Sequence, residues 1–292
     1  MTTAVERRTL VRPDGTRIAY RVEGRGPALV LTNGLTTSTV FWKHLVPAWS
    51  RAHTVVTWDL PGHGDSGPAE SPGAAGIDAQ ASTVAALMDQ VGIERAVQVG
   101  WSTGCQIVCE LLREHEGRAR ALALLLGPAG RVLETARLPL SGTLLGAVAR
   151  YTPPGALALG FRALSQVART PLGDRLGRAL GLLGPDLGRA DAEQVLRHIP
   201  TVDPVTAQRM LLSAAQHDAR ALLGKTRLPV LIVAGDADPF APADLVGVPL
   251  HRLAPGSELV RLPAGTHTAL LDHAPLIAER VERFAAAFAR SA

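Results

Sequence analysis

The stretch that most constrains the fold of this chain is Gly100-Trp101-Ser102-Thr103-Gly104, a G-x-S-x-G pentapeptide. Residues 95–99 before it form an apolar run typical of a strand, and residues 105–112 after it are typical of a helix. A strand-to-helix turn this tight strains the backbone of its middle residue and lifts that side chain clear of the sheet. The flanking glycines leave space where a Cβ would clash. The pattern therefore predicts that Ser102 projects from the carboxyl end of a strand.

Segments of strand and helix character alternate along most of the chain. Strands are predicted at residues 8–11, 16–22, 28–32, 54–58, 95–99, 121–126, 229–234 and 258–262. The first two flank Asp14-Gly15, a hairpin signal. Helices are predicted at residues 38–50, after Asp78 as N-cap, after Ser102, and at the C-terminal end, where Ile277, Val281, Phe284 and Phe288 share one stripe. This alternation predicts an α/β fold with a mostly parallel, eight-stranded sheet covered by helices on both faces.

The alternation stops between residues 131 and 225. This segment is rich in Leu, Ala, Gly and Pro and has helix-like stretches without a strand-like run. It is too long to be a simple loop. We therefore predict a helical cap (lid) domain at residues 131–225, inserted after the sixth strand of a core domain that comprises residues 1–130 and 226–292.

Composition and charge exclude several classes of protein. Of the 292 residues, 47% are hydrophobic and 19% are charged, which supports a large core and excludes disorder. The net charge of +4 comes almost wholly from arginines, which are scattered, so no nucleic-acid partner is expected. No run approaches the ~18 apolar residues of a membrane span, and residues 1–8 lack the apolar region of a signal peptide. We therefore expect a cytoplasmic protein with no membrane partner.

Two cysteines, Cys105 and Cys109, lie one turn apart on the predicted helix after Ser102. Without further cysteines or a histidine cluster, a disulfide or a metal site is not expected, and we interpret the pair as small buried apolar side chains. No cofactor is predicted.

Functional residues are expected at the carboxyl ends of the strands, where open α/β sheets bind their ligands. The segments at these ends are Asn33-Gly34-Leu35, residues 59–66 (DLPGHGDS), the G-x-S-x-G pentapeptide, Gly235-Asp236-Ala237-Asp238-Pro239 and Gly265-Thr266-His267. A serine, an acid and a histidine therefore occur in that order at three strand ends that can converge.

With these five motifs in register, the chain resembles the α/β-hydrolase superfamily, in its serine-nucleophile, esterase/haloperoxidase-like branch. The resemblance covers nearly all of the chain apart from the insertion, and Ser, Asp, His is that superfamily's order. It implies that Ser102 attacks an acyl carbon, that His267 accepts the serine proton, and that Asp238 orients the imidazole. The backbone N–H groups of Leu35 and Thr103 would form the oxyanion hole.

Several residues have competing interpretations. Asp236 is a rival to Asp238 as the orienting acid. Members of the superfamily usually carry His-Gly where this chain has Asn33-Gly34. We expect Asn33 to form a different hydrogen bond that shifts the loop, while the oxyanion hole is kept. Asn33, Trp42 and Trp101 are tentative pocket residues, although both tryptophans could equally pack in the core. Among the remaining histidines, we interpret His63 as part of the scaffold, His217 as solvated and His273 as a surface residue.

The predicted function is hydrolysis of a small-to-medium apolar carboxylic ester through an acyl-enzyme intermediate. Haloalkane dehalogenases and epoxide hydrolases use aspartate at position 102, and hydroxynitrile lyases need a cap lysine, which is missing between Lys43 and Lys225. Alternatives are a C–C bond hydrolase, a thioesterase, a tailoring enzyme that acts on a polyketide-like substrate, and a triad-retaining sensor of small ligands. The sequence predicts a small-molecule substrate but leaves its acyl and alcohol parts, its stereochemistry and the oligomeric state open.

Overall fold

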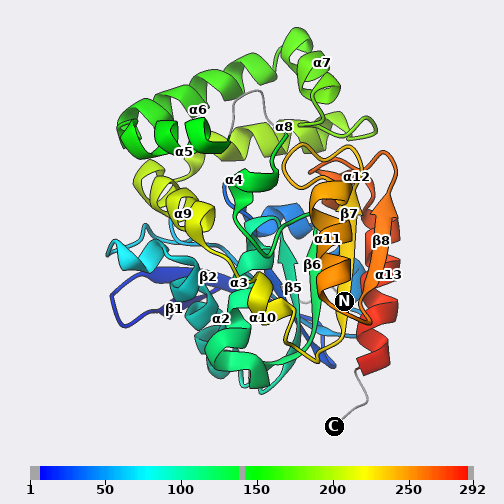
Figure 1. Ribbon diagram of the computed structural model, residues 1–292. Coiled ribbons are helices and arrows are strands. Elements are labelled where there is room, and N and C mark those ends of the chain that lie inside the picture. Colours follow the sequence, from blue (N-terminus) through cyan, green and yellow to red (C-terminus); the bar gives the residue numbers. More distant parts are fainter. Residues whose placement is uncertain (1–6, 138–141, 289–292) are drawn as a thin grey trace.

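The computed structural model describes residues 7–137 and 142–288, which form an eight-stranded sheet and the helices around it (Figure 1). The strands are β1 (Arg7–Val11), β2 (Arg17–Glu23), β3 (Ala28–Thr32), β4 (Thr54–Trp58), β5 (Ala96–Trp101), β6 (Ala119–Leu125), β7 (Val230–Gly235) and β8 (Glu258–Leu262). Their order is β1-β2-β4-β3-β5-β6-β7-β8. The pairs β1–β2 and β2–β4 are antiparallel and the others parallel. The predicted mostly parallel sheet is confirmed.

Most strands lie where the apolar runs predict them. β3, β4 and β8 begin and end at the predicted residues, and the hairpin between β1 and β2 turns at Gly15, whose φ is 88°. Strands that are buried on both faces read as continuous apolar runs. Leu29, Val30 and Leu31 of β3, for example, are all fully buried. The periodicity of the sequence therefore identifies the central strands directly.

Helices cover both faces of the sheet (Figure 1). The helices of this core are α1 (Val46–Trp49), α2 (Ile77–Val91), α3 (Thr103–His115), α11 (Val248–Leu253), α12 (Ala269–Asp272) and α13 (Ala274–Phe288). Alternate residues of a strand face opposite layers. Leu29 and Leu31 pack in one cluster with α1 and α13, whereas Val30 packs in another with α2 and α3.

Two details of the predicted helices are wrong. Residues 38–50 form a 3₁₀ turn, Thr39–Trp42, and the short helix α1 instead of one helix. Pro47 has no N–H with which to bond the carbonyl of Lys43, so a continuous helix loses a hydrogen bond there. The N-cap of α2 is Gly76, and Asp78 lies in the first turn. Ile77 is buried in the core. The helix therefore begins at Ile77, one residue before Asp78.

The segment between β6 and β7 is helical, and among its described residues, 131–137 and 142–225, there is no strand. Its helices are α4 (Val132–Thr135), α5 (Gly142–Tyr151), α6 (Pro154–Ala168), α7 (Pro171–Ala179), α8 (Arg189–His198), α9 (Pro204–Gln216) and α10 (Arg220–Leu223). In Figure 1, α5 to α8 lie above the end of the sheet. Among the helices of the described ranges, none is long and apolar enough to cross a membrane.

Backbone hydrogen bonds attach this helical segment to the loops that follow the strands. The N–H of Gly184 donates to Thr268 Oγ1 (2.9 Å), and the N–H of Arg137 donates to the carbonyl of Pro239 (2.7 Å). The N–H of Asp203 donates to the carbonyl of Gly62 (2.8 Å). These contacts place the helices over the carboxyl ends of β4, β7 and β8, which is the edge of the sheet that carries the sequence motifs.

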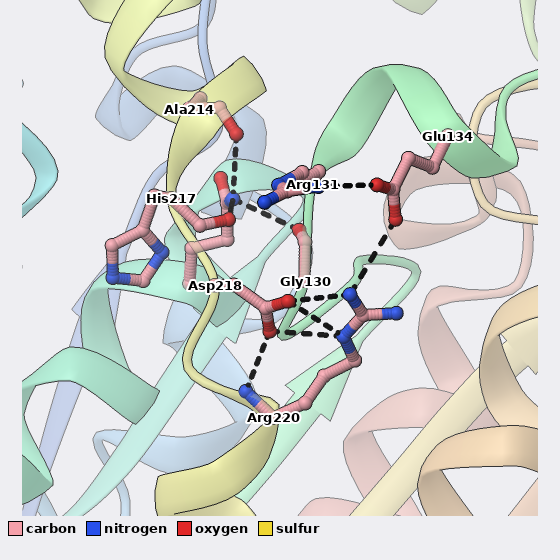
Figure 2. A network of polar contacts seen from close by, with 8 residues as sticks. Gly130, Arg131, Glu134, Ala214, His217, Asp218 and Arg220 are labelled. Atoms are coloured by element: carbon pink, nitrogen blue, oxygen red, sulfur yellow. Dashed lines mark hydrogen bonds and ion pairs between the residues drawn. The ribbon is translucent and has the colours of Figure 1, made fainter.

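One buried side chain of α3 contacts the chain where it leaves the sheet and again at the end of α9 in the helical segment. Gln106 of α3 is fully buried, and its Nε2 donates to the carbonyls of Gly130 (2.9 Å), Ala214 (2.9 Å) and His217 (3.3 Å). Figure 2 shows these carbonyls beside a chain of ion pairs formed by Arg131, Glu134, Asp218 and Arg220. Gln106 thus joins Gly130, where the chain leaves the sheet, to the end of α9, and we call this place the neck.

Cys105 and Cys109 are free, buried thiols in α3, as the sequence predicts. Burial raises the pKa of the Cys109 thiol to about 12 and that of Cys105 well above its ordinary value. Thiols of this kind remain protonated and unreactive, so the pair belongs to the packing of α3 against the sheet.

Candidate active site

Ser102 lies in the turn between β5 and α3. Its φ of 55° and ψ of −125° are sterically unfavourable for a residue with a Cβ. Its N–H donates to the carbonyl of Leu125 (3.0 Å) and holds the turn in place. A Cβ on Gly100 would lie 2.5 Å from the carbonyl oxygen of Gly104, and a Cβ on Gly104 would lie 2.3 Å from that of Thr32. The two glycines therefore permit the close packing that positions the strained serine.

The structure brings Ser102, His267 and Asp238 into one hydrogen-bonded row. His267 Nε2 lies 2.9 Å from Ser102 Oγ, and its Nδ1 lies 2.8 Å from Asp238 Oδ2. An ionised carboxylate can only accept, so Nδ1 carries the proton and Nε2 is free to accept one from the serine. This is the geometry that general-base activation of a serine requires.

Asp238 is buried and held by the backbone as well as by the histidine. Its Oδ1 accepts hydrogen bonds from the N–H groups of Phe240 (2.8 Å) and Ala241 (3.0 Å). The rival acid, Asp236, points elsewhere and pairs with Arg261 at 2.6 Å. Of the two aspartates, the one in contact with His267 is therefore Asp238.

The loop after β3 approaches the serine from the other side. The N–H of Leu35 donates to Thr103 Oγ1 at 2.7 Å. The backbone N–H of Thr103 belongs to the first residue of α3, where helical N–H groups have no intrahelical acceptor. Both residues predicted to form the oxyanion hole thus lie beside Ser102. The threonine hydroxyl between them is not predicted by the sequence motifs, which indicate only backbone donors.

His63 holds this loop. Its Nδ1–H donates to the carbonyl of Pro61 (2.7 Å), and its Nε2 accepts the N–H of Thr36 (3.0 Å). Burial lowers the pKa of His63 to about 4, so the ring is neutral and its Nε2 remains an acceptor. His63 was interpreted as scaffold, and the structure shows what it supports: Thr36 has a φ of 63°, a conformation that needs a fixed partner.

The three residues suggested as pocket lining, Asn33, Trp42 and Trp101, all lie in the buried core. Asn33 and Trp42 are fully buried, and Asn33 Oδ1 accepts the indole N–H of Trp42 while Nδ2 donates to the carbonyl of Trp58 (2.7 Å). This pairing satisfies the amide but leaves neither side chain open to a ligand. Asn33 is therefore corrected from a pocket residue to one that joins β3, β4 and the turn at Trp42, and Trp42 takes the core alternative.

Two aromatic rings flank His267. Trp101 is 2% exposed, and its ring centroid lies 5.8 Å from the imidazole. Phe240 lies closer, at 4.9 Å, and was missed by the sequence reasoning. The signal for Phe240 was its position just after Asp238-Pro239, in the same loop as the acid. These rings keep water from part of the imidazole and its partner.

The other histidines lie away from this row. His217, predicted to be solvated, is 12% exposed and its Nε2 lies 2.8 Å from Glu110 Oε2, beside the neck. His273 lies 3.5 Å from Asp272. A cavity of about 270 Å³ lies beside β1 and β2, lined by residues such as Tyr20, Arg21 and Asp65, but it does not include the serine, the acid or the histidine.

The chain is similar to known proteins over nearly its whole length. A profile of the family described as alpha/beta hydrolase fold matches residues 27–274. A pimeloyl-[acyl-carrier protein] methyl ester esterase of Neisseria meningitidis is 30% identical over 271 residues, which cover 91% of this chain and 92% of that protein. The polyketide synthase ThaQ of Burkholderia thailandensis is 30% identical over 276 residues, 89% of this chain but 12% of that protein. Among solved structures, a bromoperoxidase from Bacillus anthracis has a TM-score of 0.79 at 19% identity, covering 96% of this chain and 99% of that one.

Proposed function

Because this chain belongs to the alpha/beta hydrolase fold family, we propose that it is a carboxylic ester hydrolase with Ser102 as nucleophile, His267 as general base and Asp238 as the acid that orients the base. The observation that supports this most is the unbroken row of hydrogen bonds from Ser102 Oγ through the imidazole to Asp238. Relatives that are 30% identical over nine-tenths of the chain are named as esterases, in agreement with this proposal.

The proposed reaction has two halves. Ser102 Oγ forms a bond to the carbonyl carbon of the ester while its proton moves to His267 Nε2, and the carbonyl π electrons become an oxyanion. The oxyanion then collapses, the bond to the alcohol breaks, and the alcohol takes the proton from His267. In the second half a water gives its proton to His267, attacks the acyl carbon and releases the acid, and the proton returns to Ser102.

The helical segment at residues 131–225 is proposed to act as the cap domain that selects the substrate. It hydrogen-bonds to the loops after β4, β7 and β8, so it faces the strand ends from which Ser102, Asp238 and His267 project. The rings of Trp101 and Phe240 beside the imidazole make this side of the site apolar. An uncharged ester of small to medium size fits such surroundings better than an ionic one.

A panel of p-nitrophenyl esters, from acetate to longer acyl chains, tests this function. We expect multiple turnovers on at least one member by the wild-type protein and loss of turnover in Ser102→Ala, by about 10⁴-fold or more. Turnover that persists in Ser102→Ala on every substrate cleaved would contradict the proposed nucleophile. A single slow turnover that leaves a stable adduct on Ser102 would indicate a ligand sensor in place of an enzyme.

An ester carried on an acidic carrier protein is the second candidate substrate. Two helices of the cap, α6 and α7, expose large apolar side chains, including Leu159, Leu172 and Leu176, which are 51–68% exposed. Residues 142–180 contain five arginines and a single acid, Asp174, which pairs with Arg178. An apolar surface with an excess of arginines suits an acidic partner. The names of the relatives, one specific for an acyl-carrier protein and one a polyketide synthase, favour the same candidate.

The two candidates differ in how the rate depends on the carrier. For a carrier-borne substrate, kcat/KM for a methyl ester attached to a carrier protein exceeds that for the same free ester at least tenfold, and the excess falls as salt screens the arginines. Equal values for the two esters would remove the carrier from the proposal and leave the free ester as substrate.

A further inference from the structure

The hydroxyl of Thr103 occupies an unusual place beside the nucleophile. It accepts the hydrogen bond of the Leu35 N–H, the group that the fold would otherwise aim at a developing oxyanion. The distance of 2.7 Å is short for an N–H···O bond. Thr103 is 7% exposed, so water does not compete freely for this position. The Leu35 N–H is therefore already engaged before any substrate arrives.

The loop that carries this N–H is fixed from several sides. The next N–H, of Thr36, donates to the neutral ring of His63 (3.0 Å), and the hydroxyl of Thr37 donates to the carbonyl of Gly34 (2.6 Å). A Cβ on Gly34 would lie 2.7 Å from Ser102 Cβ, so the loop is packed directly against the nucleophile. A loop held in this way does not readily turn its N–H away from Thr103.

The oxygen of the Thr103 hydroxyl accepts a hydrogen bond, but its proton is free to be donated. Within the described residues, 7–137 and 142–288, Thr103 Oγ1 takes part in one hydrogen bond, as acceptor from Leu35. A hydroxyl can accept and donate at the same time, and accepting a bond strengthens the bond it donates. Thr103 therefore retains a polarised O–H donor next to its own backbone N–H.

From this arrangement we propose that the side-chain hydroxyl of Thr103 is a catalytic donor of the oxyanion hole. The Leu35 N–H donates to Thr103 Oγ1, and Thr103 O–H donates to the oxyanion together with the Thr103 backbone N–H. Leu35 acts through the hydroxyl, as a positioning residue. No proton is transferred by Thr103: the serine proton still moves to His267, and the hydroxyl only stabilises the negative charge. This proposal rests on the proposed function of Ser102.

Two substitutions separate this role from packing. Thr103→Val keeps the shape and the backbone N–H but removes the hydroxyl, and Thr103→Ser keeps the hydroxyl but removes the methyl group. For the best ester of the panel, we expect Thr103→Val to lower kcat by about 10²-fold with KM changed less than threefold, which is the loss seen when one oxyanion donor is removed. Thr103→Ser is expected to stay within about fivefold of the wild type.

Three results would overturn the proposal. If Thr103→Val were as active as the wild type or more active, the hydroxyl would merely block the Leu35 N–H. If Thr103→Val and Thr103→Ser lost kcat equally, the effect would come from packing. An increase in KM without a loss of kcat would likewise contradict a donor that acts on the transition state.

A second measurement needs no knowledge of the substrate. The rate at which a fluorophosphonate labels Ser102 depends on stabilisation of the charged phosphoryl oxygen, and it is expected to fall at least tenfold in Thr103→Val and less than threefold in Thr103→Ser. Equal labelling rates in wild type and Thr103→Val would contradict only the role of the hydroxyl and would leave the proposed function intact. Absence of labelling in the wild type would contradict the proposed function itself, so the two failures are distinguishable.

Discussion

At the scale of single residues, the two aspartates of the loop after β7 differ in their partners. Asp238 contacts His267 and two backbone N–H groups, whereas Asp236 pairs with the half-exposed Arg261. Asp238→Asn would favour the wrong imidazole tautomer and is expected to lower kcat by about 10⁴-fold. Asp236→Asn is the matched control, two residues away, and should remain within about threefold of the wild type. Comparable losses in both variants, measured on the same ester, would contradict the assignment.

His63 makes stability depend on pH. Its pKa is about 4 in the folded protein, against 6.5 ordinarily, so the unfolded chain binds a proton more readily. The contribution of the neutral ring is therefore complete above pH 6.5 and is lost as the pH falls toward 4. The depression corresponds to about 3 kcal/mol.

The measurement is the free energy of unfolding from pH 7 to pH 4 in wild type and His63→Gln, whose side chain does not titrate. We expect the wild type to lose about 3 kcal/mol more than the variant over this range. Parallel curves for the two proteins would show that His63 is not kept neutral by the fold.

The sequence predicted which functional residues follow the strands, but it predicted fewer of the contacts that these residues make with one another. The order of motifs and their positions after apolar runs identified Ser102, Asp238 and His267, which the structure brings within hydrogen-bonding distance. The roles of Thr103 Oγ1 and Asn33 could not be predicted, because each depends on a rotamer and on a partner distant in the chain. Asn33 lies 25 residues from its partner Trp58.

At the scale of elements, α3 packs closely against β3 because Gly104 has no side chain. A Cβ on Gly104 would lie 2.3 Å from the carbonyl oxygen of Thr32, a backbone atom that cannot move away easily. Gly104→Ala is therefore expected to lower the free energy of unfolding by about 2 kcal/mol or more. Gly117→Ala serves as control, because nothing lies within 4 Å of its Cβ position.

Chemical denaturation of both variants checks this expectation. Gly117→Ala should change the free energy of unfolding by less than about 1 kcal/mol. Equal stability of Gly104→Ala and the wild type would show that the helix and the strand do not pack as closely as described. The bounds of the strands were predicted well from the sequence. The helix expected at residues 38–50 is instead divided at Pro47, because the missing N–H of proline outweighs the apolar periodicity.

At the scale of the whole molecule, Gln106 holds the helical segment at residues 131–225 to the sheet-covering helix α3 at the neck. Its Nε2 serves three carbonyls from the outgoing and the returning chain, in a fully buried position. The surrounding ion pairs are exposed and contribute little. Gln106→Leu leaves buried carbonyls without donors and is expected to cost about 2 kcal/mol of unfolding free energy.

Limited proteolysis provides the second readout for the neck. We expect Gln106→Leu to be cleaved faster than the wild type near Gly130 and in residues 214–217, with Gln166→Leu on the exposed face of α6 as the control. Identical cleavage patterns in the three proteins would contradict the assignment of Gln106 as the connection between the two parts. The sequence predicted that residues 131–225 form a helical insertion. It could not predict the neck, because the acceptors there are backbone carbonyls, which every residue has.

If Ser102 is an activated nucleophile, a fluorophosphonate should label it covalently, and peptide mass spectrometry locates the adduct. We expect one adduct per chain, located on the peptide that contains Ser102, with labelling abolished in Ser102→Ala and slowed at least a hundredfold in His267→Ala. An adduct on another residue, or labelling that is unchanged in Ser102→Ala, would contradict this role of Ser102.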